Sequence, residues 1–290
     1  MSLAEPVEPF RGGGVFSAAP RGDATFRQTK SNLSSYPRPA GGVFRSDYSM
    51  SYSPESYSRD FYSTDASLDT RSAFLRKVYA HVFGAVLAMV ALISLICTVE
   101  PLANALMGLA FSAWWVILVG FIAISFIAER MAYSQASRGV QYAGLGLYVL
   151  AQSIIITPMV YALTSGAFGI ANGTEIVLQA AGLTLLIFGG LTAVVFLTKA
   201  DFTFLRGFLA VAGFGVLGLI IVSLVFGVHL GTWFSVGMVV LLALTILYET
   251  SAIRENFPPD AYVAAALALF GSISTMFFYI LRLLISLNSD

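Results

Sequence analysis

The most constraining feature of the sequence is the length of its stretches without charge. The longest runs from Gly207 to Tyr248, 42 residues with no Asp, Glu, Lys or Arg. A helix that crosses a bilayer needs about 20 apolar residues, so this run is too long for one crossing and fits two. A soluble domain carries about 25% charged residues, whereas this chain has 11% and is 57% hydrophobic. The sequence therefore predicts an all-α integral membrane protein.

The charges gather near the N-terminus. Residues 1–72 hold half of the 16 Lys and Arg and half of the 16 Asp and Glu. This part is rich in Gly, Ser, Pro, Arg and Tyr, and it has no run that could bury a core, which is typical of disordered segments. We expect a disordered cytoplasmic tail over 1–72, acting as a tether or as a docking segment for a partner. A transmembrane domain follows over 73–290, with Ser72 as a candidate N-cap of its first helix.

The charge-free runs of the second part predict seven spans. The candidate segments are 78–99, 101–128, 139–163, 176–198, two helices within 207–248 joined by a turn near 227–233, and 261–287. The tail and the even-numbered loops hold basic residues, namely Arg71, Arg76, Lys77, Arg130, Arg138, Lys199, Arg206 and Arg254, whereas the odd-numbered loops hold none. By the positive-inside rule we expect the N-terminus in the cytoplasm and the C-terminus outside.

The sequence offers little for catalysis or for metal binding. Cys97 is the only cysteine, and His81 and His229 lie far apart without metal-ligand spacing. No nucleophile, base and acid stand in a pattern typical of an active site. We therefore expect a non-enzymatic protein with no catalytic residue, no cofactor, no metal and no nucleic-acid partner.

One carboxylate ends the longest charge-free run. Glu249 stands at the mouth of a predicted membrane helix, where holding a charge costs on the order of a few kcal/mol, so it is a functional candidate. Two interpretations are open. Glu249 is an interfacial acid paired with a base, for which Arg130, Lys199 and Arg206 are candidates, or it is a gate or proton sensor. Glu129 and Arg130 close the second span on the same side, where they could seal the bundle with Glu249.

A second pattern lies in the last span. Small and polar side chains recur there at intervals of four and three residues and form one stripe: Ala268, Ser272, Thr275, Tyr279 and Arg282. Such side chains let membrane helices approach closely and form hydrogen bonds. We expect a central, buried last helix, and a narrow polar path is the alternative. We interpret Gly189, Gly190, Gly213 and Gly218 of other spans as packing contacts too.

Three segments carry a resemblance to a known family. They are Phe74-Leu-Arg-Lys-Val-Tyr79, the loop Leu197-Thr-Lys-Ala-Asp-Phe-Thr-Phe-Leu-Arg-Gly207, and Leu247-Tyr-Glu-Thr-Ser-Ala-Ile253. Together with seven spans, they resemble the Bax inhibitor (TMBIM) family over about residues 73–290. The resemblance implies a seven-helix bundle whose last helix is central and wrapped by the other six.

The resemblance also bears on Glu249. It implies that family members acting as pH-sensitive calcium leaks carry two aspartates near the cytoplasmic side. Here the first falls on Glu249, and the second falls on Gly271, so the second acid is absent. The Glu-Thr-Ser version resembles the bacterial branch typified by YccA, a modulator of the membrane AAA protease FtsH. We therefore expect a regulator in the bacterial plasma membrane, with lipid and an FtsH-like protease as partners. A leak for calcium or another cation, sensitive to protons, is the alternative.

Overall fold

The computed structural model describes residues 64–134, 137–170, 172–227 and 230–288, so the predicted tail up to residue 63 lies outside the described residues. Within these ranges the regular elements are α2 (Thr64–Thr98), α3 (Glu100–Ser112), α4 (Trp114–Ala132), α5 (Arg138–Thr164), α6 (Gly173–Thr198), α7 (Leu205–Phe226), α8 (Thr232–Glu255) and α9 (Tyr262–Asn288). All of them except α3 are long and apolar enough to cross a membrane, which confirms seven spans in the described part of the chain.

The first span starts earlier than the sequence suggests. Helix α2 begins at Thr64, so the predicted tail overlaps the helix at 64–72. Ser72 therefore lies inside α2, and its prediction as the N-cap is wrong. The Ser72 hydroxyl instead donates a hydrogen bond to the Asp69 carbonyl of the preceding turn, at 2.9 Å. A polar helix start can extend beyond the apolar segment because water satisfies its exposed backbone groups.

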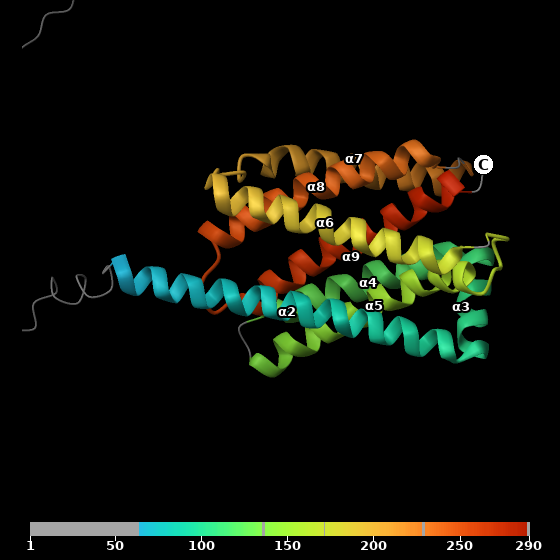
Figure 1. Cartoon of the computed structure of the whole chain (residues 1–290), viewed down its shortest axis with the longest axis horizontal. Coiled ribbons are helices and arrows are strands. Elements are labelled where there is room, and N and C mark those ends of the chain that lie inside the picture. Colours follow the sequence, from blue (N-terminus) through green and yellow to red (C-terminus); the bar gives the residue numbers. More distant parts are fainter. Residues whose placement is uncertain (1–63, 135–136, 171, 228–229, 289–290) are drawn as a thin grey trace, which may run out of the picture. The chain divides into compact units, whose positions relative to one another are not determined.

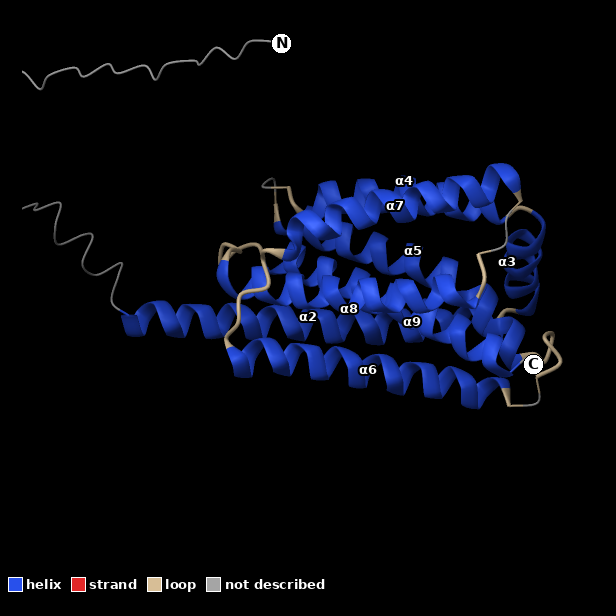
Figure 2. Ribbon diagram, turned by 90° about the horizontal axis from the view of Figure 1, so that it is seen from above, coloured by secondary structure: helices blue, strands red, loops and turns tan. Residues whose placement is uncertain are grey.

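The predicted second span, 101–128, is two helices rather than one. The chain leaves helical geometry at Ala113 (φ −146°, ψ 51°), between α3 and α4. Just before the break, the Ser112 hydroxyl donates to the Gly108 carbonyl at 2.7 Å, a back-bond that often bends helices. Figures 1 and 2 show α3 lying across one end of the longer helices. Only α4 of this pair is therefore a span.

Helix α9 forms the centre of the bundle. It packs against α2, α4, α5, α6 and α8, and more than half of its residues are buried. Its fully buried side chains include Leu269, Phe270, Met276 and Ile280. In Figure 1 this helix, in red, runs between the others. The prediction of a central, buried last helix is confirmed.

The glycine contacts differ from the prediction. A Cβ built at Gly189, Gly190, Gly213 or Gly218 would meet no atom within 4 Å, so these four do not mark close packing. They lie on α6 and α7, which are largely exposed at the surface of the bundle. The close approaches are elsewhere. A Cβ at Gly144 of α5 would lie 2.7 Å from the Ala128 carbonyl oxygen of α4, so these two backbones are in direct contact.

Arginines join the helix ends at one side of the bundle. The Arg71 guanidinium of α2 donates at 2.6–2.7 Å to three carbonyls at the end of α8, those of Ile253, Arg254 and Phe257. Arg254 in turn donates at 2.7–3.2 Å to carbonyls at the end of α6, those of Val195, Lys199 and Ala200. The last carbonyls of a helix lack partners within the helix and carry partial negative charge, so a cation is favourable there. The ends of α6 and α8 and the beginning of α2 are thereby held together.

Candidate functional site

Glu249 lies near the end of α8, and its carboxylate contacts the central helix. The Ser272 hydroxyl of α9 donates a hydrogen bond to Glu249 Oε2 at 2.7 Å. Ser272 is buried and Glu249 is half-buried. A hydrogen bond to an ionised carboxylate is among the stronger ones available to a hydroxyl. The sequence pointed to both residues, as the lone acid and as a member of the stripe, but it did not pair them.

The expected salt bridge of Glu249 does not form. Among the described residues, the ion pair within 4.0 Å joins Arg254 to its neighbour Glu255. Arg130 lies over the ring of Phe126 on its own helix, with the guanidinium carbon 5.0 Å from the ring centroid. Lys199 caps the end of α6 in left-handed geometry (φ 52°). Glu249 lies on the side of α8 that contacts α9, whereas Glu129 and Arg130 are exposed. The gate role of these residues stays a prediction.

The space beside Gly271 is filled by an aromatic side chain. A Cβ built on Gly271 would lie 2.8 Å from the Tyr148 hydroxyl and 3.3 Å from two of its ring carbons. Tyr148 comes from α5, is buried, and meets Phe270 edge-on with ring centroids 6.1 Å apart. A larger side chain at position 271 would have to displace this phenol. Sequence reasoning missed Tyr148, because nothing in the sequence distinguishes it from other tyrosines of the apolar segments.

The rest of the stripe contacts several elements. Thr275 accepts a hydrogen bond from Gln152 of α5 at 3.4 Å. Tyr279 packs edge-on against Phe234 of α8, with ring centroids 5.9 Å apart. Arg282 donates to the Leu230 carbonyl, just before α8. Each of these side chains therefore contacts a neighbouring element of the bundle, which favours helix packing over an open polar path.

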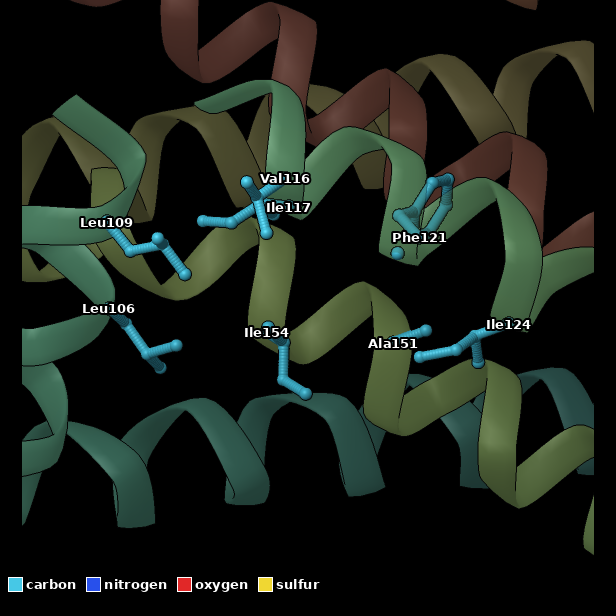
Figure 3. A pocket seen from close by; sticks show the side chains of 9 residues that line it. Leu106, Leu109, Val116, Ile117, Phe121, Ile124, Ala151 and Ile154 are labelled. Atoms are coloured by element: carbon cyan, nitrogen blue, oxygen red, sulfur yellow. The ribbon is translucent and has the colours of Figure 1, made fainter. Parts of the chain in front are cut away.

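An apolar pocket of about 160 Å³ lies between α3, α4 and α5 (Figure 3). It is lined by Leu106, Leu109, Val116, Ile117, Gly120, Phe121, Ile124, Ala151 and Ile154. None of these side chains can bind an ion, and Glu249 is not among them. In the part of the chain that the structure describes, no three His, Cys, Asp or Glu side chains gather closely enough to hold a metal. Glu249 and its surroundings are therefore the candidate site.

Comparison with known proteins decides the family. The model of the family described as "Inhibitor of apoptosis-promoting Bax1" matches residues 71–289. This chain belongs to the Bax inhibitor family. The matched range contains Glu249, Ser272, Gly271 and Tyr148, so the candidate site lies within the family domain.

Individual relatives of this Bax inhibitor family protein come from bacteria, yeast and plants. An uncharacterised protein of Pseudomonas aeruginosa is 30% identical over 178 residues, which cover 61% of this chain and 76% of that protein. Bax inhibitor 1 of Schizosaccharomyces pombe is 28% identical over 231 residues, 76% of this chain and 79% of the relative. Protein LIFEGUARD 3 of Arabidopsis thaliana is 27% identical over 231 residues, 76% and 87% of the two chains. With seven helices in its described part that are long and apolar enough to cross a membrane, the chain is a multi-pass membrane protein of this family.

Proposed function

We propose that this Bax inhibitor family protein is a non-enzymatic membrane regulator that acts through contact with a membrane partner, such as an FtsH-like AAA protease. The observation that carries the proposal is the packing around Glu249. Its carboxylate accepts a hydrogen bond from Ser272, and the phenol of Tyr148 fills the space beside Gly271. The site is thus a lone acid held by a hydroxyl in a packed bundle.

The missing second acid argues against a two-carboxylate sensor. Two carboxylates at close range cannot both ionise easily, so they share a proton and respond to pH as a pair. At Gly271, where the family resemblance places the second acid of calcium-leak members, the neighbouring group is the uncharged phenol of Tyr148. The acid that the family resemblance pairs with Glu249 is therefore absent at position 271.

The arginine-joined end of the bundle supports a role in contact with a partner. By the positive-inside rule, this end faces the cytoplasm of a bacterial plasma membrane. The N-terminal segment leads into α2 here, and Arg71 of α2 holds the end of α8, the helix that carries Glu249. A partner that binds the N-terminal segment would act on α8 through this connection.

A pH-sensitive calcium or cation leak is the second candidate. The observation in its favour is that Glu249 is half-buried on a membrane helix. Carboxylates within membrane segments commonly mark ion or proton paths. In this alternative Glu249 gates the path on the cytoplasmic side, and Arg130 and Glu129 assist at the surface.

Calcium flux separates the two candidates. Purified protein is reconstituted into liposomes that contain a calcium indicator, and calcium entry is followed at acidic and at neutral pH. The regulator proposal expects no entry above protein-free liposomes at either pH. Calcium entry through wild type that Glu249→Gln abolishes, while the exposed control Glu175→Gln at the start of α6 preserves it, would establish the leak instead.

Partner capture tests the regulator proposal directly. The FtsH-like protease of the same cells is expected to co-purify with the full chain and to be lost from a chain that starts at residue 64. This truncation spares α2 and Arg71, because the helix begins at Thr64. Equal recovery of the protease with both chains would show that the N-terminal segment is not needed for binding. No recovery with either chain would show that the protease is not a partner.

A further inference from the structure

A cluster of aromatic and basic side chains lies where α2, α5 and α9 meet, separate from the Glu249 site. His81 of α2 places Nε2 3.0 Å from the Tyr142 hydroxyl of α5, and its Nδ1 lies 2.6 Å from the Lys77 carbonyl. The Tyr142 hydroxyl lies 3.3 Å from that of Tyr262 of α9. The ring of His81 contacts both tyrosine rings, with centroids 5.1–5.5 Å apart. Three helices thus contribute to one polar, aromatic group.

Two cations lie against the same ring of this cluster. Lys77 Nζ is 5.5 Å from the centroid of the Tyr262 ring, and Arg138 Cζ is 5.0 Å from it. Lys77 stands one turn before His81 on α2, and Arg138 stands one turn before Tyr142 on α5. Both cationic side chains are exposed. Contacts with a tyrosine face are favourable for a cation, but they leave its charge in place.

Among the described residues, no carboxylate forms an ion pair with the cations of the cluster. Arg138 contacts Asp260 through the backbone, donating to its carbonyl at 2.6 Å. Within the described ranges, the ion pair shorter than 4.0 Å is the distant Arg254–Glu255. Arg138 is also the first residue of α5, and a helix N-terminus adds partial positive charge. Two cations and a helix end therefore face the surface here, where an anion would be stabilised.

We propose that this cluster binds the phosphate of an anionic phospholipid headgroup. The cluster lies near the membrane-surface ends of three spans, at the depth where tyrosines and basic side chains meet headgroups. Lys and Arg donate charge-assisted hydrogen bonds to phosphate oxygens, and both Lys77 and Arg138 are exposed to such a group. Beyond the cluster, α2 continues into the membrane with exposed apolar side chains, including Phe83 and Leu87, which acyl chains can cover.

Lipid titration tests this proposal. Full-length protein in a nonionic detergent is titrated with phosphatidylglycerol or with phosphatidylcholine of the same acyl chains, and bound lipid is counted by native mass spectrometry. Wild type is expected to prefer phosphatidylglycerol. The double variant Lys77→Gln/Arg138→Gln should weaken phosphatidylglycerol binding by about fivefold for each cation removed and leave phosphatidylcholine binding unchanged.

The matched control removes the same charge elsewhere. Arg76→Gln/Arg206→Gln changes two exposed basic residues outside the cluster and is expected to keep the preference. If the double variant fails to fold, Lys77→Gln alone keeps the bond from Arg138 to Asp260 and should still lose about fivefold. An equal loss in the control pair, an unchanged preference in the cluster variants, or displacement of the lipid by an equal concentration of inorganic phosphate would each overturn the proposal.

Discussion

Helices α7 and α9 are both apolar spans, but they take opposite places in the bundle. Helix α7 is the more hydrophobic of the two. None of the residues of α7, all of them described, is buried, whereas more than half of those of α9 are. Lipid is as apolar as leucine, so hydrophobicity does not drive a helix inward from the membrane, and packing and hydrogen bonds select the interior. The less hydrophobic helix is therefore the central one.

The glycines of the two helices make the same distinction. Gly213 and Gly218 of α7 have open space where a side chain would begin, whereas Gly271 of α9 has the Tyr148 hydroxyl there. A glycine in a membrane helix therefore marks close packing only when another helix lies against that face. The following predictions test this contrast, beginning with the largest effect.

The largest difference is expected for a phenylalanine in each helix. Phe270 of α9 is fully buried, whereas Phe214 of α7 is 77% exposed. Phe270→Ala leaves a cavity and should cost about 3–5 kcal/mol of unfolding free energy. Phe214→Ala removes a side chain from the exposed surface of the bundle, and the unfolding free energy should stay within about 0.5 kcal/mol of wild type. Reversible unfolding in detergent measures both, and equal costs would show that α7 and α9 are packed alike.

A smaller loss is expected at the hydroxyl that holds Glu249. Ser272→Ala removes its hydrogen bond and leaves a half-buried carboxylate short of a donor, which should cost about 1–3 kcal/mol. The control is Thr245→Val, because the Thr245 hydroxyl donates within its own helix to the Leu241 carbonyl. If Ser272→Ala has no larger effect than this control in the same unfolding assay, the contact between α8 and α9 is energetically unimportant.

Substitution of Gly213 and Gly218 of α7 by alanine should stabilise the protein rather than destabilise it. Gly213→Ala and Gly218→Ala add a methyl group that meets no neighbour within 4 Å. Alanine is favoured over glycine inside a helix by about 0.5–1 kcal/mol. Slight stabilisation is therefore expected from unfolding curves, and a clear destabilisation would indicate that this face of α7 is covered by another chain.

The smallest effect concerns the loop that leads into α7. Asp201 accepts a hydrogen bond from the Thr203 amide at 2.8 Å, and its hydrogen bonds with Thr203 hold the pKa of its carboxyl below the usual value of 3.8. A lowered folded-state pKa contributes stability above the unfolded pKa, and this contribution is lost as the pH falls through the folded pKa.

Hydrogen exchange at the start of α7, corrected for intrinsic rates, should therefore show weaker protection below about pH 4, while α9 stays protected. Asp201→Asn should remove this pH dependence. Loss of protection in α7 and α9 together would show that the two helices open as one unit.

Much of the architecture was predictable because a membrane imposes simple lengths. Charge-free runs predicted the number of spans. The polar stripe predicted a packed last helix but not its inward face, because Ser272 is buried whereas Thr275 and Tyr279 are only partly buried. Helix ends were less predictable. Thr64 begins α2 in a polar segment, and the break at Ala113 interrupts an apolar run that has no helix-breaking residue at that point.

The candidate site was predictable only in its residues. Glu249 and Ser272 stand out in the sequence, one by charge and one by spacing. Their contact depends on the rotation of α8 relative to α9, which hydropathy does not encode. The same orientation of α8 explains why Glu249 accepts a hydrogen bond from the Ser272 hydroxyl instead of forming a salt bridge with Arg130. The contact of Tyr148 was not predictable, because it depends on which residue of α5 lies against Gly271 of α9.

The central claim is that Tyr148 packs directly on Gly271 and so closes the space beside Glu249. A double-mutant cycle in unfolding free energy tests it most directly. Gly271→Ala should cost about 1–3 kcal/mol by overpacking, because the new methyl group lies 2.8 Å from the Tyr148 hydroxyl. In a Tyr148→Phe background that hydroxyl is absent, and the cost should fall by about 1 kcal/mol or more. An equal cost of Gly271→Ala in both backgrounds would contradict the account.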